Sequence, residues 1–214
     1  MLLRKDVAKL PVGTGVYALK NRGDFLYIGK AGNISQRVKS HFSNPSYKDK
    51  LFLDKVKKIG YIETDSEIEA LALEARIIKK YQPRYNIMWK DDKNYFYAAI
   101  TKEKFPRVFI THQPEKNSKF TYIGPFVDGN SIKKTLRFLR KTFPYISVKK
   151  HQKSPCLYCH LKLCPGPDPN VREYKKDLNN LKAVLLGKKT SVLRNLKKEM
   201  SELSKKSEFD VAET

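Results

Sequence analysis

Residues 15–33 read GVYALKNRGDFLYIGKAGN, in which a Gly-x-Tyr and a Tyr-x-Gly stand on either side of a short polar break. Both flanking segments have the composition of β-strands, and the break supplies a glycine for a turn. The pattern predicts a β-hairpin with strands over residues 15–20 and 25–29. With a three-residue loop, Tyr17 would lie directly opposite Tyr27.

A helix is expected directly after the hairpin. Asn33, with Gln36 three residues later, has the pattern of a helix N-terminus in the style of a capping box. Apolar residues then recur at helical spacing. Arg37 and His41 are four residues apart, so they share one face of this helix.

A second helix is predicted between Thr64 and Tyr81. Thr64-x-x-Glu67 is a capping-box pattern, apolar residues follow at helical spacing, and Pro83 ends the helix. The same spacing places Glu74 on the side of the helix that faces the core. A carboxylate in such a position is unusual, because acids are rarely buried without a partner.

Four regions follow from the patterns along the chain. The expected fold class is α+β: a small antiparallel or mixed sheet with flanking helices, then a small α+β connector, then C-terminal helices. The regions are residues 1–94 with the hairpin and both helices, 95–148 as the connector, 149–170 with the cysteines, and 171–214 as a helical region. Within the connector, strands are expected over 95–101, 107–111 and 122–126, and a basic helix over 131–142.

Positive charge dominates the composition. Lys and Arg number 44 against 22 Asp and Glu, which gives a formal net charge of +22 and a pI near 9.8. Such a field favours a nucleic acid as the partner over a membrane, although a basic surface that only keeps a protein soluble has the same composition. No apolar run approaches the roughly 20 residues that span a bilayer, and the N-terminus lacks the apolar core of a secretory signal. We expect a cytoplasmic protein with no membrane partner.

The N-terminal region holds side chains suited to phosphodiester hydrolysis. That reaction needs a water nucleophile, a proton acceptor, positive charge for the transition state and usually a divalent metal ion. Only one of these side chains is a carboxylate expected to face the core, which favours a single metal ion with oxygen ligands over a two-metal site. The candidate residues are Tyr17, Tyr27, Lys30, Arg37, His41 and Glu74.

Each candidate also has a purely structural interpretation. Tyrosines paired across a hairpin are most often packing partners. A core-facing Glu74 is often held in a structural ion pair, here with Arg37. His41 alone is more often a packing residue than a base, and Asn86 fits a turn or backbone-binding role.

The motifs resemble those of a known nuclease family. Gly15-Val16-Tyr17 and Tyr27-Ile28-Gly29-Lys30-Ala31, followed by Asn33, Arg37 and Glu74, are similar to the GIY-YIG nucleases. The stretch TDSEIEALALEARIIKKYQPRYNIMWKDDKNY, residues 64–95, resembles the UvrC family, the incision subunits of bacterial nucleotide excision repair. FPRV at 105–108, YIGPF at 122–126 and FP at 143–144 are similar to the connector of that family.

This resemblance implies a small central antiparallel sheet with flanking helices and a role for each motif residue. It assigns Glu74 to a Mg²⁺ or Mn²⁺ ion, Arg37 to the scissile phosphate, and Tyr17 and Tyr27 to the activation and positioning of water. It adds Lys30, His41 and Asn86 as further site residues.

The resemblance also implies a reaction and partners. The reaction is a metal-dependent nick on the 3′ side of a lesion in damaged DNA, made in a complex with UvrB and that DNA. LRNLKKEMSELSKKSEFDVAE, residues 193–213, resembles the beginning of the UvrB-binding motif of the family. We expect the chain to be truncated within that motif, without the ribonuclease H-like and helix-hairpin-helix parts.

The cysteines form one cluster in the sequence. Cys156, Cys159 and Cys164 are an odd number within nine positions, which suits a metal or free thiols better than disulfides. The resemblance implies an iron–sulfur cluster or another metal such as Zn²⁺, but the family typically has four cysteines in a different spacing. His160 would complete a three-Cys, one-His set, although ligands from adjacent residues strain a tetrahedral site. Buried or free thiols are the alternative.

Two other functions are compatible with these patterns. The chain could be a GIY-YIG nuclease that cuts branched or undamaged DNA without repair partners. It could also be a module that binds DNA or a partner protein without cleaving, although such a module needs no carboxylate that faces the core. Phosphate contacts would make either function steeply salt-dependent.

Overall fold

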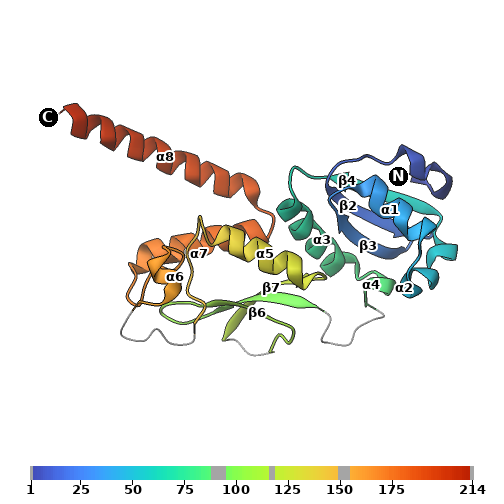
Figure 1. Cartoon of the computed structure of the whole chain (residues 1–214), viewed down its shortest axis with the longest axis horizontal. Helices are drawn as coiled ribbons and strands as arrows, with labels where there is room; N and C mark the ends of the chain where they lie inside the picture. The colour runs from blue at the N-terminus through green and yellow to red at the C-terminus, as the bar shows by residue number, and fades with distance from the viewer. Residues whose placement is uncertain (1, 88–94, 116–118, 149–154, 213–214) are drawn as a thin grey trace.

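The computed structural model describes residues 2–87, 95–115, 119–148 and 155–212, and it confirms the α+β class (Figure 1). Two antiparallel sheets lie in one chain, each with helices against it. The strands are β1 (Leu2–Leu3), β2 (Gly15–Lys20), β3 (Phe25–Ala31), β4 (Lys58–Glu63), β5 (Phe96–Thr101), β6 (Val108–Thr111) and β7 (Phe120–Phe126). The helices are α1 (Ile34–Ser43), α2 (Tyr47–Lys50), α3 (Glu67–Tyr81), α4 (Arg84–Ile87), α5 (Gly129–Leu139), α6 (Leu157–His160), α7 (Val171–Leu185) and α8 (Lys189–Ala212), with 3-10 turns η1 (Arg4–Lys9) and η2 (Leu53–Lys55).

The first sheet has the strand order β1-β4-β2-β3 and is covered on both faces. Successive residues of a strand point to opposite faces, so β2 contributes to two separate cores. Tyr17 and Leu19 pack with α1 on one face. Val16 packs with α3 on the other, together with Ile28 of β3. The site described below lies at the end of β3 that is nearest to α1.

The predicted hairpin is present, but its predicted register is wrong. Tyr17 lies opposite Gly29, two positions beyond the expected Tyr27. The turn contains four residues, closed by the Asn21 N–H donating to the Asp24 carbonyl at 3.0 Å, and the register shifts next to it. A shift of two leaves every side chain on its expected face. The two tyrosines therefore still share a face, with ring centroids 6.2 Å apart.

The starts of the two main helices are set by capping side chains. Asn33 caps α1 as predicted and accepts the Gln36 N–H at 2.8 Å. The N-cap predicted for α3 is displaced by two residues, because Ser66 is the N-cap and its hydroxyl accepts the Glu69 N–H, while the Glu69 carboxylate accepts the Asp65 N–H. Thr64 still belongs to the strand pairing, since its N–H donates to the Thr14 carbonyl at 2.8 Å.

The second sheet has the order β6-β5-β7, with α5 and α7 packed over it in a single core (Figure 1). The helix expected over residues 131–142 begins earlier, at Gly129, because the Asp128 side chain caps it. Cys164 and Tyr174 lie in the same core as the strands of this sheet. The connector strands, the cysteine segment and α7 are therefore packed together.

Helix α3 packs against both sheets. Leu71 and Ala75 pack with the second sheet, whereas Ala70 and Ile78 pack with the first. Figure 1 shows α3 between the two sheets. Glu74 lies on this helix, so its position depends on both packing surfaces.

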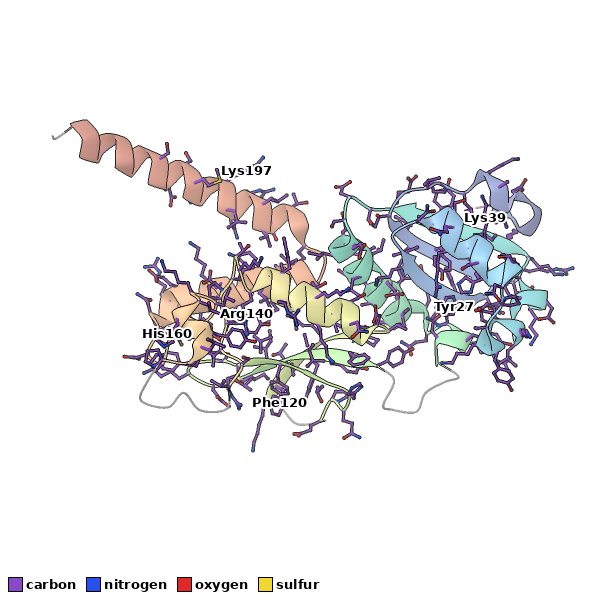
Figure 2. All side chains as sticks on the ribbon, viewed as in Figure 1. Tyr27, Lys39, Phe120, Arg140, His160 and Lys197 are labelled. Atoms are coloured by element: carbon purple, nitrogen blue, oxygen red, sulfur yellow. The ribbon has the colours of Figure 1, made fainter. Side chains whose placement is uncertain are left out.

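The last helix, α8, extends away from the rest of the structure (Figure 1). Val192 is buried near its start and Leu196 packs partly against the second core. Leu193 and Met200 on this helix are exposed. Basic side chains such as Lys197 also project from it (Figure 2). None of the helices over the described residues is long and apolar enough to cross a membrane.

The N-cap of α3 at Ser66 predicts the effect of two substitutions. Ser66→Ala is expected to lower the free energy of unfolding by about 1 kcal/mol, because it leaves a helix N–H without its acceptor. Thr64→Ala removes a hydroxyl that donates to the Ser66 carbonyl but caps no helix N–H, and it is expected to cost clearly less. Urea unfolding of both variants measures the difference. A larger loss for Thr64→Ala would contradict the assignment of the cap.

Candidate active site

The carboxylate of Glu74 is buried beside β3, as its helical spacing predicted. The residue is 4% exposed, and its Oε1 accepts the backbone N–H of Lys30 at 2.9 Å. Its Oε2 is buried and has no hydrogen-bond partner among the described residues. Burial raises the pKa of Glu74 from 4.5 to about 7, although the bond from Lys30 opposes that rise. Glu74 forms no ion pair with Arg37, so the structural interpretation of this acid is not supported.

A second side chain also binds the outer edge of β3. Asn86 of α4 accepts the N–H of Ile28 and donates to the Ile28 carbonyl, both at 2.8 Å. Its own carbonyl accepts the Tyr95 hydroxyl at 2.7 Å. Asn86 does not line the cavity described next. Its geometry is that of a backbone-binding residue, which is one of the two interpretations that the sequence allows.

A cavity of about 730 Å³ brings most of the predicted residues together. It lies where β3 and α1 meet α3, and segment 127–128 after β7 closes one side. His41 and Asn86 stand behind its wall. The lining residues include Tyr17, Tyr27, Lys30, Arg37 and Glu74, with Gln36, Ser40 and Asp128 as polar residues that the sequence patterns did not indicate.

The two tyrosines are protonated phenols at neutral pH. Burial raises the pKa of Tyr17 well above 10, and a negative charge on Tyr27 would raise it further. Burial likewise raises the pKa of Tyr27. Arg37 acts in the opposite direction on both, and its guanidinium hydrogen-bonds Tyr17. The positive charge of Arg37 therefore lies beside the phenol oxygen of Tyr17.

Gly29 makes room for Tyr17. A Cβ at position 29 would lie 2.6 Å from the Tyr17 Oη and 3.0 Å from the Tyr27 ring, so any side chain here would displace both. The glycine of the Tyr-x-Gly pattern is explained by this close approach.

His41 lies behind Tyr17 and contacts a residue that the sequence did not single out. Its Nε2 is 2.6 Å from the Tyr17 Oη, and its Nδ1 is 2.7 Å from an oxygen of Asp49. Burial lowers the pKa of His41, although Asp49 opposes this. Asp49 belongs to the four-residue helix α2, where a sequence pattern shows only a helix cap.

Asp128 is a second carboxylate at the rim of the cavity. It is exposed and comes from outside the first 90 residues, so Glu74 is still the one core-facing carboxylate of the N-terminal candidates. The oxygens of Asp128 already accept from the Asn130 N–H and the Ser131 hydroxyl, which caps α5. Among the described carboxylates of the cavity, Glu74 retains an uncommitted buried oxygen.

The donor set of the cavity fits a hard divalent cation. A buried carboxylate oxygen without a partner is costly unless something binds it. Mg²⁺ and Mn²⁺ take oxygen ligands, often one or two carboxylates completed by water and phosphate. Glu74 could hold such an ion, with Asp128 close enough to add to the negative field.

The three cysteines also lie together in space. Their Sγ atoms are all within 4.8 Å of one another, and those of Cys156 and Cys159 are 3.4 Å apart. Burial raises the pKa of Cys164 to about 12. His160 is exposed and is not part of the cluster (Figure 2). Three thiols in this arrangement could hold a metal ion, whereas the set with His160 is not formed.

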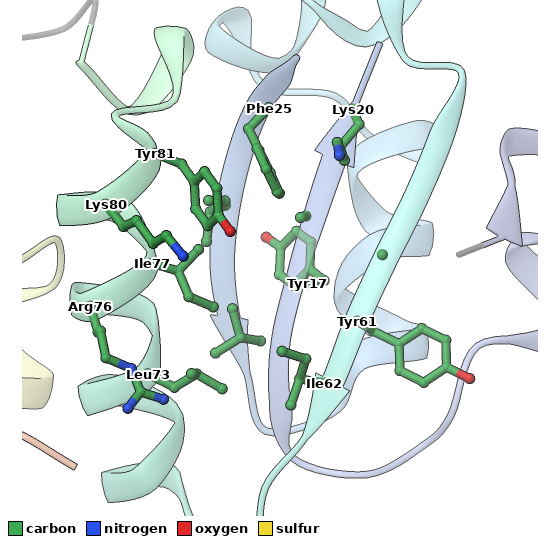
Figure 3. A pocket seen from close by; sticks show the side chains of 14 residues that line it. Tyr17, Lys20, Phe25, Tyr61, Ile62, Leu73, Arg76, Ile77, Lys80 and Tyr81 are labelled. Carbon is green, nitrogen blue, oxygen red and sulfur yellow. The ribbon is translucent and has the colours of Figure 1, made fainter. Parts of the chain in front are cut away.

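A second hollow of about 770 Å³ lies between α3 and strands β2 and β4 (Figure 3). Its floor is apolar, with Leu73 and Ile77 facing Ile62. Its charged lining residues, Lys20, Arg76 and Lys80, are all basic. Because this groove has no carboxylate, it lacks the groups that hydrolysis requires.

The raised pKa of Glu74 predicts how its replacement affects stability. Glu74→Gln is expected to stabilise the metal-free protein at pH 8, because ionising a buried carboxyl with a pKa of about 7 opposes folding. The gain, at most roughly 3 kcal/mol, should shrink as the pH falls from 7 to 4.5 and vanish below 4.5, where the carboxyl is mostly protonated in both states. Urea unfolding in EDTA at pH 5 and pH 8 measures it.

The matched control for this measurement is Glu67→Gln, an exposed acid in the first turn of the same helix. It should change the free energy of unfolding by less than about 1 kcal/mol and in the destabilising direction, because it removes a favourable helix-dipole interaction. A Glu74→Gln variant that is less stable than the wild type at pH 8 would contradict the burial argument.

Comparison with known protein families identifies two domains in the chain. A UvrC-like GIY-YIG domain matches residues 13–87, and the UvrC/Cho excinuclease middle domain matches residues 95–183. UvrABC system protein C of Caldicellulosiruptor saccharolyticus is 37% identical over 225 residues, which covers 100% of this chain and 38% of that protein. The same protein of Methanococcus maripaludis is 38% identical over 213 residues, covering 97% and 40%. The chain thus spans about two fifths of the length of these relatives.

Solved structures include the GIY-YIG N-terminal endonuclease domain of UvrC from Thermotoga maritima bound to magnesium. It is 38% identical, covers 38% of this chain and 92% of that domain, and has a TM-score of 0.37. Together, the two matching family models extend over most of the chain, from residue 13 to residue 183. The chain belongs to the UvrC family, with a GIY-YIG domain followed by the UvrC middle domain.

Proposed function

We propose that this chain is a metal-dependent DNA endonuclease of nucleotide excision repair that nicks the damaged strand on the 3′ side of a lesion, in complex with UvrB. The observation that carries the proposal is the buried Oε2 of Glu74, which has no hydrogen-bond partner in the described part of the chain and belongs to the same cavity as Arg37 and Tyr17. A binding module gains nothing from an uncompensated buried carboxylate, whereas a metal ion would compensate it.

The residues of the cavity divide the work of phosphodiester hydrolysis. When bound at Glu74, Mg²⁺ or Mn²⁺ would supply Lewis-acid stabilisation of the negative charge that develops on the phosphate. Arg37 would bind the scissile phosphate, with Lys30 as a second cation in the cavity. Tyr17 and Tyr27 would orient and deprotonate the attacking water. His41 and Asn86 would act from behind the wall of the cavity, through Tyr17 and β3 respectively.

Damaged duplex DNA and UvrB are the proposed partners, and the cytoplasm is the proposed compartment. The net charge of +22 favours contact with the DNA backbone. The name of the relatives, UvrABC system protein C, supports membership of a repair system with several components. Exposed Leu193 and Met200 on α8 leave apolar side chains available for a partner helix.

Two variants test the proposed site. Glu74→Gln and Arg37→Ala are each expected to slow nicking by about 10²-fold or more, because they remove contacts made to the transition state. DNA binding should remain nearly unchanged. Strand-resolved nicking of a lesion-bearing duplex at saturating Mg²⁺ or Mn²⁺, with and without UvrB, measures the rate and the position of the cut.

Glu67→Gln and Arg22→Ala are matched controls, since both remove an exposed charge outside the cavity. They should retain wild-type rates. Wild-type turnover in either site variant, or cutting only on the 5′ side of the lesion, would reject the proposal. Equal cutting of branched or undamaged DNA without UvrB would favour a stand-alone nuclease, and intact binding with no cutting under any metal would favour a binding module.

We further propose that Cys156, Cys159 and Cys164 bind either an iron–sulfur cluster or a Zn²⁺ ion. Thiolates are the preferred ligands of both, and the three sulfurs are already grouped. Anaerobically purified protein is expected to contain iron or zinc in stoichiometric amount, lost in Cys156→Ser. Elemental analysis with an absorption spectrum tests this, and protein that contains neither metal would show that the thiols are free.

A further inference from the structure

Three buried side chains from three different elements form a continuous hydrogen-bonded chain behind the cavity. The Tyr17 Oη lies 2.6 Å from Nε2 of His41, and Nδ1 of His41 lies 2.7 Å from Oδ1 of Asp49. The three residues are 1%, 4% and 9% exposed. Only Tyr17 also lines the cavity, so the chain leads from the reaction space into the interior.

Asp49 is held in place independently of His41. Its Oδ2 accepts the N–H of Ser46 at 2.9 Å and the Ser46 hydroxyl at 2.8 Å, which closes the capping box of α2. Although burial opposes it, these bonds and His41 lower the pKa of Asp49, so the carboxylate is ionised at neutral pH. An ionised carboxylate can only accept.

This anchoring fixes the tautomer of His41. Because Asp49 only accepts, Nδ1 must carry the proton. In the neutral imidazole Nε2 then has a lone pair, and it faces the Tyr17 hydroxyl, which donates to it. Carboxylates that accept the other ring N–H of catalytic and metal-binding histidines orient them in the same way.

The surroundings of His41 keep it neutral and able to accept a proton. The titratable groups that face it are Tyr17 from β2, Tyr27 from β3, Arg37 on its own helix and Asp49 from α2. Burial and Arg37 lower the pKa of His41, whereas Asp49 raises it. Asp49 is thus the group that stabilises the imidazolium once a proton arrives.

Tyr17 needs such an acceptor if it is to act as a base. Its pKa lies well above 10 because of burial, so the phenolate is scarce before reaction. A phenol can take a proton from water only if its own proton leaves in the same step. We propose that Tyr17, His41 and Asp49 form a proton relay in which Tyr17 is the general base, His41 receives its proton and Asp49 is the positioning residue. This inference rests on the proposed nuclease function.

In this step one proton passes from water to His41 by way of Tyr17. The oxygen of water forms a bond to phosphorus, and the bond from phosphorus to the leaving oxygen breaks. One proton of the water moves to Tyr17 Oη while the phenol proton moves to Nε2 of His41. The leaving oxygen takes a proton from solvent, and the imidazolium later returns its proton through Tyr17 to water in the cavity.

Asp49→Asn tests the relay through the pH dependence of nicking. The variant is expected to slow kcat by about 10²-fold, because the imidazolium loses its stabilising charge. The acid limb of the kcat profile, which reports protonation of His41, should move to lower pH, because Asp49 raises that pKa. Asp49→Glu should recover part of the rate and return the limb towards its original position.

Two control variants separate the relay from a structural role. Asp54→Asn removes an exposed carboxylate nearby in the chain and should leave rate and profile unchanged. Ser46→Ala opens the capping box but keeps the Asp49 charge beside His41, so it should lower the melting temperature without moving the acid limb. If Asp49→Asn lowers stability but leaves the acid limb in place, the relay is overturned.

A nuclear magnetic resonance titration tests the same geometry without nicking. The imidazole ¹⁵N shifts of His41, assigned by comparison with His41→Asn, should report the Nδ1–H tautomer and a pKa that falls in Asp49→Asn. An Nε2–H tautomer would overturn the relay even if the enzyme nicks. Wild-type protein that shows the expected shifts but never nicks would reject the nuclease function while leaving the hydrogen-bonded chain confirmed.

Discussion

The hydrogen bond from the Lys30 N–H to Glu74 is the contact on which the geometry of the cavity depends. It ties α3 to the outer edge of β3 at the point where α3 also packs against the second sheet. One carboxylate oxygen is used for this contact, and the other is left without a partner in the cavity wall. A displacement of α3 would therefore move the unpartnered Glu74 oxygen, the edge of β3 and the contact between the two sheets together.

Glu74 and Asn86 complete the edge of β3 as a neighbouring strand would. An edge strand exposes N–H and carbonyl groups that must be satisfied when a helix covers them. Asn86 satisfies both groups of Ile28, and Glu74 satisfies the N–H of Lys30. The neutral amide does so at little cost, whereas the carboxylate carries a desolvation cost that a purely structural role does not require. That difference supports a metal-binding role for Glu74 and a structural role for Asn86.

Sequence patterns predicted the features that depend on neighbouring residues. The Asn33 cap and the inward direction of Glu74 are set within a few helical turns, and both are found. The predicted hairpin register was wrong because the alternation of apolar and polar residues is unchanged when the pairing shifts by two residues. That alternation does not encode the length of the turn, which sets the register. The cap of α3 was displaced because two capping-box patterns overlap at residues 64–69, and the end of β4 decides between them.

Asp49 and Asp128 could not be predicted as site residues, because each is locally an ordinary helix cap. Only tertiary packing brings Asp49 to His41 and Asp128 towards Glu74. A capping aspartate has two oxygens, and α2 needs only one of those of Asp49. The other is free to orient an imidazole at no further cost in desolvation, because the cap has already fixed the carboxylate. A four-residue helix is in this way sufficient to hold a charge behind the cavity.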